Sequence, residues 1–537
     1  MALHPRLQKI RESQDLKLRP TTHLKPTFTG FDGKEHPLKI RYYQVQGILH
    51  LVVMKRFLLG DDTGLGKTLQ AIAALCYIWE SEPDQKAMVL TTKSATKQWA
   101  QEFAKFTTGI RVFVNKGTPK QREKIREAFL ASTGPTVMIM GYGTARRDYT
   151  HMQDWSGFIF VGDEATAFKN PKAQIHQICK YLSLAADRCW ALTATLIKNN
   201  LMEGYGVYKV VEPELFPISQ HAFMLYYCLT RMQRIPRSNR QIPVIVGYTP
   251  QKIAEFKGEI EPFFLGRPKF EVASELPALV TRTIEVGLSP DQQLKYEEAL
   301  EGLESLGVSS LAVGESRADG EEEIKEVTKL TAITYCQEIV NHLGLIECDG
   351  PSKKMDALFE LLTEGDFLEE KVIIFTRFRA MVDILMPLFK KAKIPAVRIT
   401  GSEDEDQRAE AMAAFQDPDN ETRVVCITMA GSDAINLQAA KAIIFYDTPW
   451  SAGDFIQIVG RMIRIGSEHD RCYAIHLVAR GSKKTVDHRI MEVMQKKMNL
   501  IEAVIGRRIK GEQDIGAYIP KSNDISDIFD LLREDAA

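Results

Sequence analysis

Short apolar runs alternate along the chain with longer amphipathic stretches. In the first half the runs are FLLG at 57–60, MVL at 88–90, TVMIM at 136–140, FIFV at 158–161 and CWALTA at 189–194. They are rich in β-branched and aromatic residues and are bounded by Gly, Asp or Thr, which is typical of strands buried on both faces. Since the stretches between them have a helical pattern, the order predicts βαβ units that build a parallel sheet.

A second series predicts a second sheet, with runs KVIIFT at 371–376, AVRIT at 396–400, RVVCIT at 423–428, AIIFYD at 442–447 and CYAIHLV at 472–478. Between the two series the pattern is largely helical, with a polar acidic segment at 314–326 that we interpret as a solvated loop. We therefore predict an α/β protein with an N-terminal arm (1–36), a first sheet lobe (37–225), a helical middle region and linker (226–355), a second sheet lobe (356–484) and a C-terminal helix and tail (485–537).

Composition narrows the class of protein. The chain has 537 residues, 45% of them hydrophobic, and a formal net charge of -1, so a nucleic acid could be bound only through locally clustered positive charge. The cysteines are scattered without zinc spacing, which favours a reducing compartment. The sequence shows no secretory signal and no membrane span. We expect a protein inside the cell, in the cytoplasm or nucleoid of a prokaryote or virus-infected cell, or in a eukaryotic nucleus.

A glycine-rich loop follows the first apolar run and opens a helical stretch. Its sequence is GDDTGLGKT at 60–68. Gly64 and Gly66 allow backbone N–H groups to turn toward an anion, and the start of the helix adds positive charge. Lys67 can reach the β- and γ-phosphates and Thr68 can ligate Mg²⁺. The loop therefore predicts a nucleoside triphosphate site.

An acidic pair ends the strand-like run FIFVGDEAT at 158–166. Asp163 can hold Mg²⁺, and the carboxylate of Glu164 can polarise an attacking water. Together with Lys67, this pair predicts a nucleotide hydrolase.

At this point the motifs, taken in order, resemble the SNF2-type branch of the superfamily 2 helicase-like ATPases over residues 38 to 510. The segments that carry the resemblance are IRYYQ (40–44), GDDTGLGKTLQ (60–70), VLTTKSATKQWAQEF (89–103), GYGTARRD (141–148), DEAT (163–166), LTATLIKNN (192–200), PFFLGRPKFEVASELP (262–277), IIFTRF (373–378), MAGSDAINLQAA (429–440) and QIVGRMIRIGS (457–467). The resemblance implies two RecA-like lobes, a mostly helical middle insertion and a C-terminal bracing helix.

The resemblance also implies roles for individual residues. It makes Gln44 the adenine-recognising residue and places Asp61, Gly64, Leu65, Gly66, Lys67 and Thr68 on the nucleotide. The implied catalytic residues are Lys67, Asp163, Glu164, Gln457, Arg461 and Arg464. The implied Mg²⁺ ligands are Thr68 and Asp163. Contacts to nucleic acid are expected from Lys93, Trp99, Tyr142, Arg377, Thr428 and Asn436, and a basic segment adds Arg231, Arg234, Arg237 and Arg240.

Several positions depart from the family pattern. Thr166 replaces a histidine, Leu196 a proline, Gly266 one of two arginines, and 432–434 a glycine-rich stretch. A weakly active ATP-binding recruitment scaffold is therefore one alternative, and a strand-separating or annealing helicase is another. Our main prediction is an ATPase that uses ATP and Mg²⁺ to move on or remodel duplex DNA, including branched or protein-bound DNA, with a partner protein supplying the target.

Overall fold

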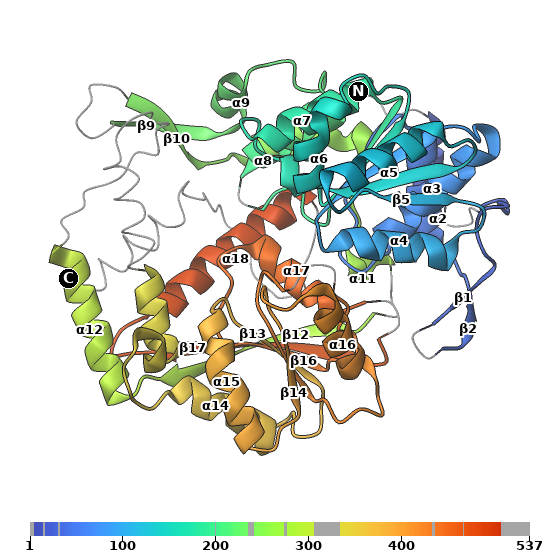
Figure 1. The fold of residues 1–537 in the computed structure, drawn as a ribbon. Coiled ribbons are helices and arrows are strands. Elements are labelled where there is room, and N and C mark those ends of the chain that lie inside the picture. The colour runs from blue at the N-terminus through green and yellow to red at the C-terminus, as the bar shows by residue number, and fades with distance from the viewer. Residues whose placement is uncertain are drawn as a thin grey trace. The chain divides into compact units, whose positions relative to one another are not determined.

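The computed structural model describes residues 5–13, 17–30, 33–198, 200–234, 241–272, 276–305, 333–431, 435–464 and 467–505. The chain forms two compact units (Figure 1). Unit 1 contains residues up to 227, 250–274 and, among the described residues, 501–505, and unit 2 contains 228–249 and 275–500. The acidic loop at 314–326 and the tail beyond 505 lie outside the described residues. Within these ranges, no helix has the length and apolar character needed to cross a membrane.

A seven-stranded sheet forms the centre of unit 1, with the order β11-β3-β8-β7-β4-β6-β5 and every pairing parallel. The predicted apolar runs of the first series all form strands, and the structure adds β5 and β11 at the two edges. The strands are β3 (Arg56–Leu59), β4 (Lys86–Thr91), β5 (Arg111–Val114), β6 (Thr136–Gly141), β7 (Ile159–Asp163), β8 (Arg188–Leu192) and β11 (Phe264–Leu265).

The helices α2 (Tyr42–Val53), α3 (Lys67–Ser81) and α4 (Ala95–Phe106) bury their apolar sides with this sheet in one core. Leu7 and Ile10 of α1 (Pro5–Glu12) are also buried, so the predicted N-terminal arm is partly a packed helix. The other elements are β1 (Thr27–Thr29), β2 (Glu35–Pro37), α5 (Pro119–Ala131), α6 (Tyr142–Asp148), η1 (Tyr149–His151), η2 (Ala165–Phe168), α7 (Gln174–Ala185), α8 (Leu201–Val211), α9 (Gln220–Tyr227), α10 (Pro250–Ile260), η3 (Glu261–Phe263) and α11 (Lys269–Val272).

Unit 2 contains a six-stranded sheet with the order β12-β17-β16-β13-β15-β14, again parallel throughout. The second series of apolar runs forms five of these strands, as predicted. The strands are β12 (Ala278–Gly287), β13 (Val372–Phe375), β14 (Ala396–Ile399), β15 (Val424–Ile427), β16 (Ala442–Phe445) and β17 (Arg471–Arg480). Two parallel sheets with helices between their strands confirm the α/β fold class.

Helices cover both faces of the second sheet. Ile374 and Ile444 pack with α14 (Lys353–Thr363) and α15 (Arg379–Lys391), whereas Phe445 lies 5.2 Å, ring to ring, from Phe455 of α17 (Ala452–Met462). Since successive side chains of a strand point to opposite faces, α17 lies on the face opposite to α14 and α15 (Figure 1). Further helices are α12 (Pro290–Ser305), η4 (Leu343–Ile346), α16 (Glu405–Gln416) and α18 (Val486–Ile505), and residues 333–341 are helical as well.

The middle region differs from its predicted helical character. Besides helices it contains the antiparallel hairpin of β9 (Leu229–Arg234) and β10 (Gln241–Gly247). Its strand β11 pairs with β3 in the sheet of unit 1, and its strand β12 pairs with β17 in the sheet of unit 2. No apolar run marks these strands, because β11 is only two residues long and β12 is an edge strand with most of its residues exposed, three of them in succession at 281–283. The region therefore contributes an edge strand to each sheet.

Candidate active site

The glycine-rich loop leaves β3 and runs into α3 in a conformation that only glycine adopts easily at two positions. Gly64 has a φ of 85° and Gly66, the residue before the helix, a φ of 74°. A Cβ on Gly66 would lie 2.6 Å from Nε2 of Gln44, so a side chain there would also require the Gln44 amide to move. The result is a loop whose backbone precedes the positive end of a helix, as the sequence predicted.

Lys67 is the first residue of α3, and its Nζ donates to the carbonyl oxygens of Asp61 at 2.8 Å and Asp62 at 3.2 Å. The ammonium group is thus held over the loop. The hydroxyl of Thr63 is buried in the same loop without a hydrogen-bond partner among the described residues. A phosphate group would satisfy both side chains, so the residues present fit a nucleotide.

Gln44 lies on α2 and is buried next to this loop. Its Nε2 donates to the carbonyl of Leu65 at 3.2 Å, and its Oε1 accepts the backbone N–H of Arg41 at 3.0 Å. The structure thus brings Gln44 to the phosphate loop, where it supports the turn. Recognition of adenine by Gln44 stays a prediction.

Asp61 was expected to contact the nucleotide, but both of its oxygens are already occupied. Arg267 donates from Nε to Oδ1 at 2.8 Å and from Nη2 to Oδ2 at 2.5 Å, and Gln70 donates to Oδ2 at 3.0 Å. Asp61 is fully buried and Arg267 is 7% exposed. The Asp61 carboxylate therefore anchors the loop to the chain after β11. Lys67 and the loop backbone are the candidates for phosphate contact, and contact of Asp61 with the nucleotide stays a prediction.

The acidic pair lies where the sequence placed it. Asp163 ends β7, and Glu164 follows with a left-handed φ of 51°. Strand β8 separates β7 from β3, so the pair and the phosphate loop lie at the same carboxyl edge of the sheet. Thr166 donates its hydroxyl to Oε1 of Glu164 at 2.9 Å, so the residue that replaces the family histidine still holds the glutamate.

Burial raises the pKa of Asp163 above its ordinary value. Hydrogen bonds from Trp99 and Thr91 and the charge of Lys67 act in the opposite direction, while the Glu164 carboxylate adds to the rise. A partly buried carboxylate beside a strand-end glutamate suits a divalent cation, whose charge would favour the ionised form. Asp163 and Thr68 therefore remain candidate Mg²⁺ ligands; the described residues contain no cluster of three or more His, Cys, Asp and Glu that could hold a metal alone.

Trp99 and Tyr142 were expected to contact nucleic acid; the Trp99 side chain is buried in unit 1, and that of Tyr142 is partly exposed. Trp99 is 1% exposed and donates its indole N–H to Oδ2 of Asp163 at 2.7 Å. The Tyr142 hydroxyl donates to the backbone carbonyl of Asp163 at 2.6 Å. These side chains therefore belong to the candidate ATP site, whereas Lys93, just before α4, is exposed as a phosphate contact requires.

In unit 2, the expected catalytic residues do not all lie on one helix. Gln457 and Arg461 lie on α17, one turn apart, but the helix ends at Met462. Arg464 follows it and donates from Nε to the carbonyl of Gly460 at 3.0 Å. Arg464 therefore does not share a helical face with Gln457 and Arg461, since Ile463 between them has an extended backbone.

The residues expected to contact nucleic acid in unit 2 differ in whether their polar groups already have partners. Arg377 lies 4.1 Å from the ring centre of Trp450 and donates to Gln337, so its guanidinium is already engaged. Oγ1 of Thr428 and Oδ1 of Asn436 are buried without a partner in the described ranges. Arg231 is exposed on β9. The side chain of Arg234, as well as Arg237, Arg240 and 432–434, lies outside the described residues.

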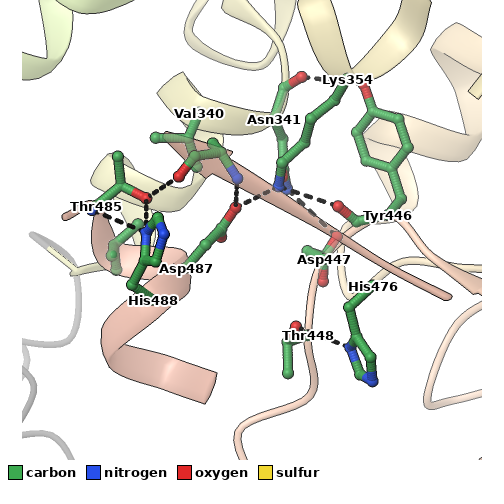
Figure 2. A network of polar contacts seen from close by, with 12 residues as sticks. Val340, Asn341, Lys354, Tyr446, Asp447, Thr448, His476, Thr485, Asp487 and His488 are labelled. Carbon is green, nitrogen blue, oxygen red and sulfur yellow. Dashed lines mark hydrogen bonds and ion pairs between the residues drawn. The ribbon is translucent and has the colours of Figure 1, made fainter. Parts of the chain in front are cut away.

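A buried polar network joins the elements that surround this part of unit 2 (Figure 2). Lys354 of α14 contacts Asp487 of α18 at 2.5 Å and donates to Oδ1 of Asn341 at 2.9 Å and to the carbonyl of Tyr446 at 3.1 Å. Asp447 continues the network by accepting the Thr376 hydroxyl at 2.5 Å. Since Lys354 and Asp487 are 1% and 2% exposed, this ion pair fixes α14 and α18 against the carboxyl end of β16.

Comparison with known families gives two matches in order along the chain. The model of the SNF2-related domain matches residues 43–345, and that of the helicase conserved C-terminal domain matches residues 353–466. Among solved structures, the chain is similar to the Sulfolobus solfataricus SWI2/SNF2 ATPase core in complex with dsDNA, with 22% identity and a TM-score of 0.40. That match covers 88% of this chain and 98% of the other.

Curated relatives are longer than this chain. It is 25% identical to the ATP-dependent DNA helicase DDM1 of Arabidopsis thaliana, over 93% of this chain and 66% of the relative. It is 27% identical to the Chromodomain-helicase-DNA-binding protein 1-like of Mus musculus, over 87% of this chain and 50% of the relative. It is 26% identical to the ISWI chromatin-remodeling complex ATPase ISW2 of Saccharomyces cerevisiae, over 92% of this chain and 43% of the relative. The chain thus spans less than two thirds of the length of each of these relatives.

Proposed function

The chain belongs to the SNF2-related family of helicase-like ATPases, and on that premise we propose that it hydrolyses ATP to move along or remodel duplex DNA. The main support for the proposal is that the phosphate loop and the acidic pair lie at the same edge of the unit 1 sheet. The relatives named as a DNA helicase and as chromatin-remodeling ATPases support the choice of DNA as the track.

In this proposal each residue of the site has a separate task. The loop N–H groups, Lys67 and the hydroxyl of Thr63 bind the phosphates, in place of the contacts that Lys67 makes to the loop carbonyls. Thr68 and Asp163 hold Mg²⁺, which when bound neutralises charge on the β- and γ-phosphates. Glu164 orients the attacking water and accepts its proton. Arg461 and Arg464 stabilise the negative charge of the transition state.

The alternative of a weakly active ATP-binding recruitment scaffold is less well supported. It is motivated by Thr166 and by 432–434, and 432–434 lies outside the described residues. The Thr166 hydroxyl holds the Glu164 carboxylate at 2.9 Å, so that substitution does not leave the proposed base unsupported. We therefore propose an active enzyme, and we propose translocation on duplex DNA in preference to strand separation.

ATP hydrolysis measured without nucleic acid and with single-stranded DNA, duplex DNA or RNA tests this function, with Lys67→Ala as the blank. We expect the strongest stimulation by duplex DNA and displacement of a third strand from a triplex without unwinding. Displacement of one strand from a partial duplex would support a helicase instead. Absence of hydrolysis on every substrate would support the scaffold.

We expect affinity for duplex DNA to fall as salt is raised, because phosphate contacts release counterions. Lys93→Ala and Arg231→Ala should each reduce the slope of log affinity against log salt by about one, since each removes one contact. Gel-shift titrations at several salt concentrations measure this slope. Lys124→Ala, on the exposed face of α5, is the matched control. If both variants kept the wild-type slope, Lys93 and Arg231 would not contact DNA phosphates.

A further inference from the structure

The carboxylate of Asp163 is held by two side chains that converge on one of its oxygens. Trp99 of α4 donates its indole N–H to Oδ2 at 2.7 Å, and Thr91, the last residue of β4, donates its hydroxyl to the same atom at 2.9 Å. Trp99 and Thr91 are 1% and 0% exposed. Hydrogen bonds to a carboxylate in such a buried place are stronger than bonds between neutral groups, so they fix its rotation.

The other oxygen is used less. Oδ1 of Asp163 accepts one hydrogen bond, from the backbone N–H of Glu164 at 3.0 Å. Since each carboxylate oxygen accepts two bonds, Oδ2 is saturated by Trp99 and Thr91 while Oδ1 keeps one position for a further partner. The hydroxyl of Tyr142 fixes the backbone of the same residue through its carbonyl oxygen at 2.6 Å. The arrangement therefore presents one defined oxygen of Asp163.

We propose that Trp99 is a positioning residue of the ATP site: its indole N–H holds Oδ2 of Asp163 so that Oδ1 faces the Mg²⁺ of bound nucleotide. The inference rests on the proposed function, because it assumes that Asp163 serves the metal. Residues that orient a metal ligand from outside the coordination sphere typically contribute about ten- to a hundredfold to metal affinity or activity. Trp99 therefore acts on the metal without touching it.

The chain offers a closely matched control. Trp190 of β8 belongs to the same hydrophobic core as Trp99, is fully buried, and donates its indole N–H to the carbonyl of Met54 at 3.4 Å, not to the acidic pair. Trp99→Phe and Trp190→Phe remove the same atoms from the same core. Any effect of lost volume alone should appear in both variants, whereas an effect on the metal should appear in only one.

Binding of fluorescent mant-ADP tests the proposal in the full-length protein, with excess Mg²⁺ and with EDTA. We expect Trp99→Phe to weaken binding about tenfold in Mg²⁺ and to leave the affinity in EDTA within about twofold of the wild type. The Mg²⁺ concentration for half-maximal binding should rise by a similar factor. Trp190→Phe should resemble the wild type under both conditions.

Equal losses with Mg²⁺ and with EDTA, or no loss in Mg²⁺, would overturn the role of Trp99. If Trp99→Phe fails to fold, Thr91→Val is the second variant, because it removes the other donor to the same oxygen. Thr91→Val should give a smaller loss of affinity in Mg²⁺. A Thr91→Val protein that responds to Mg²⁺ as the wild type does would overturn the inference. A wild-type protein that binds mant-ADP with no dependence on Mg²⁺ would also overturn the inference, because Asp163 would then not serve the metal. Failure of the proposed function is a distinct result, the absence of ATP hydrolysis by the wild-type protein.

Discussion

Replacing Glu164 with glutamine is expected to lower the rate of ATP hydrolysis by about a hundred- to ten-thousandfold while ATP still binds. Glu164 follows β7 with a left-handed backbone, and its Oε1 accepts the hydroxyl of Thr166 at 2.9 Å. Glutamine keeps the shape and the acceptor for Thr166, but it cannot take a proton from water. Phosphate release at saturating ATP in the presence of duplex DNA measures the loss, and mant-ADP titration measures the binding that should remain.

A matched control separates this effect from a general loss of charge. Glu127→Gln makes the same change on the exposed face of α5 and should hydrolyse ATP at the wild-type rate. If Glu164→Gln kept a rate within about threefold of the wild type, another group would have to be the base. If it lost binding as well as hydrolysis, Glu164 would support the nucleotide site and not the chemical step alone.

The parts of this site that the sequence predicted are those encoded by neighbouring residues. The phosphate loop depends on a strand, two glycines and a helix start within 60–68, and the acidic pair depends on one apolar strand. Local patterns of this kind specify backbone geometry directly, because the residues that form the feature are adjacent. The positions of Lys67, Asp163 and Glu164 at one sheet edge therefore followed from the pattern.

Contacts between distant residues could not be predicted in the same way. The family resemblance implied that Asp61 contacts the nucleotide, and nothing in the sequence indicates that its carboxylate pairs with Arg267, 206 positions away. Trp99 appeared suited to nucleic acid, and only its packing shows that it bonds to Asp163, 64 positions away. A family resemblance placed both residues in functional segments, but it could not tell a ligand contact from a buried support.

Replacing Arg267 with methionine is expected to destabilise unit 1 by about 3–5 kcal/mol, because it leaves the Asp61 carboxylate buried without its cation. Asp61 is fully buried, and Arg267 also donates to the carbonyl of Tyr43 and to Oε1 of Gln46 at 3.2 Å. Methionine fills much of the same volume but provides no donor. Denaturant unfolding followed by tryptophan fluorescence measures the change, since four of the five tryptophans lie at 79, 99, 155 and 190 in unit 1.

Two further variants identify the cause of that loss. Arg146→Met makes the same substitution at an exposed position of α6 and should change the stability of unit 1 by no more than about 0.5 kcal/mol. Asp61→Asn combined with Arg267→Met removes the buried charge and should recover part of the stability lost in Arg267→Met alone. A double variant no more stable than Arg267→Met would show that the arginine acts through packing and its bonds to Tyr43 and Gln46.

Arg267→Met and the double variant Asp61→Asn with Arg267→Met also test how the loop binds phosphate. Without Arg267, the negative charge of Asp61 remains in the loop whose carbonyl at Asp61 contacts Lys67 at 2.8 Å. That charge would repel a triphosphate and attract the ammonium group that should bind it. Affinity for mant-ADP should therefore fall in Arg267→Met and return in part when Asp61 is also made neutral. A fall that persists in the double variant would mean that Arg267 shapes the loop by means other than its charge.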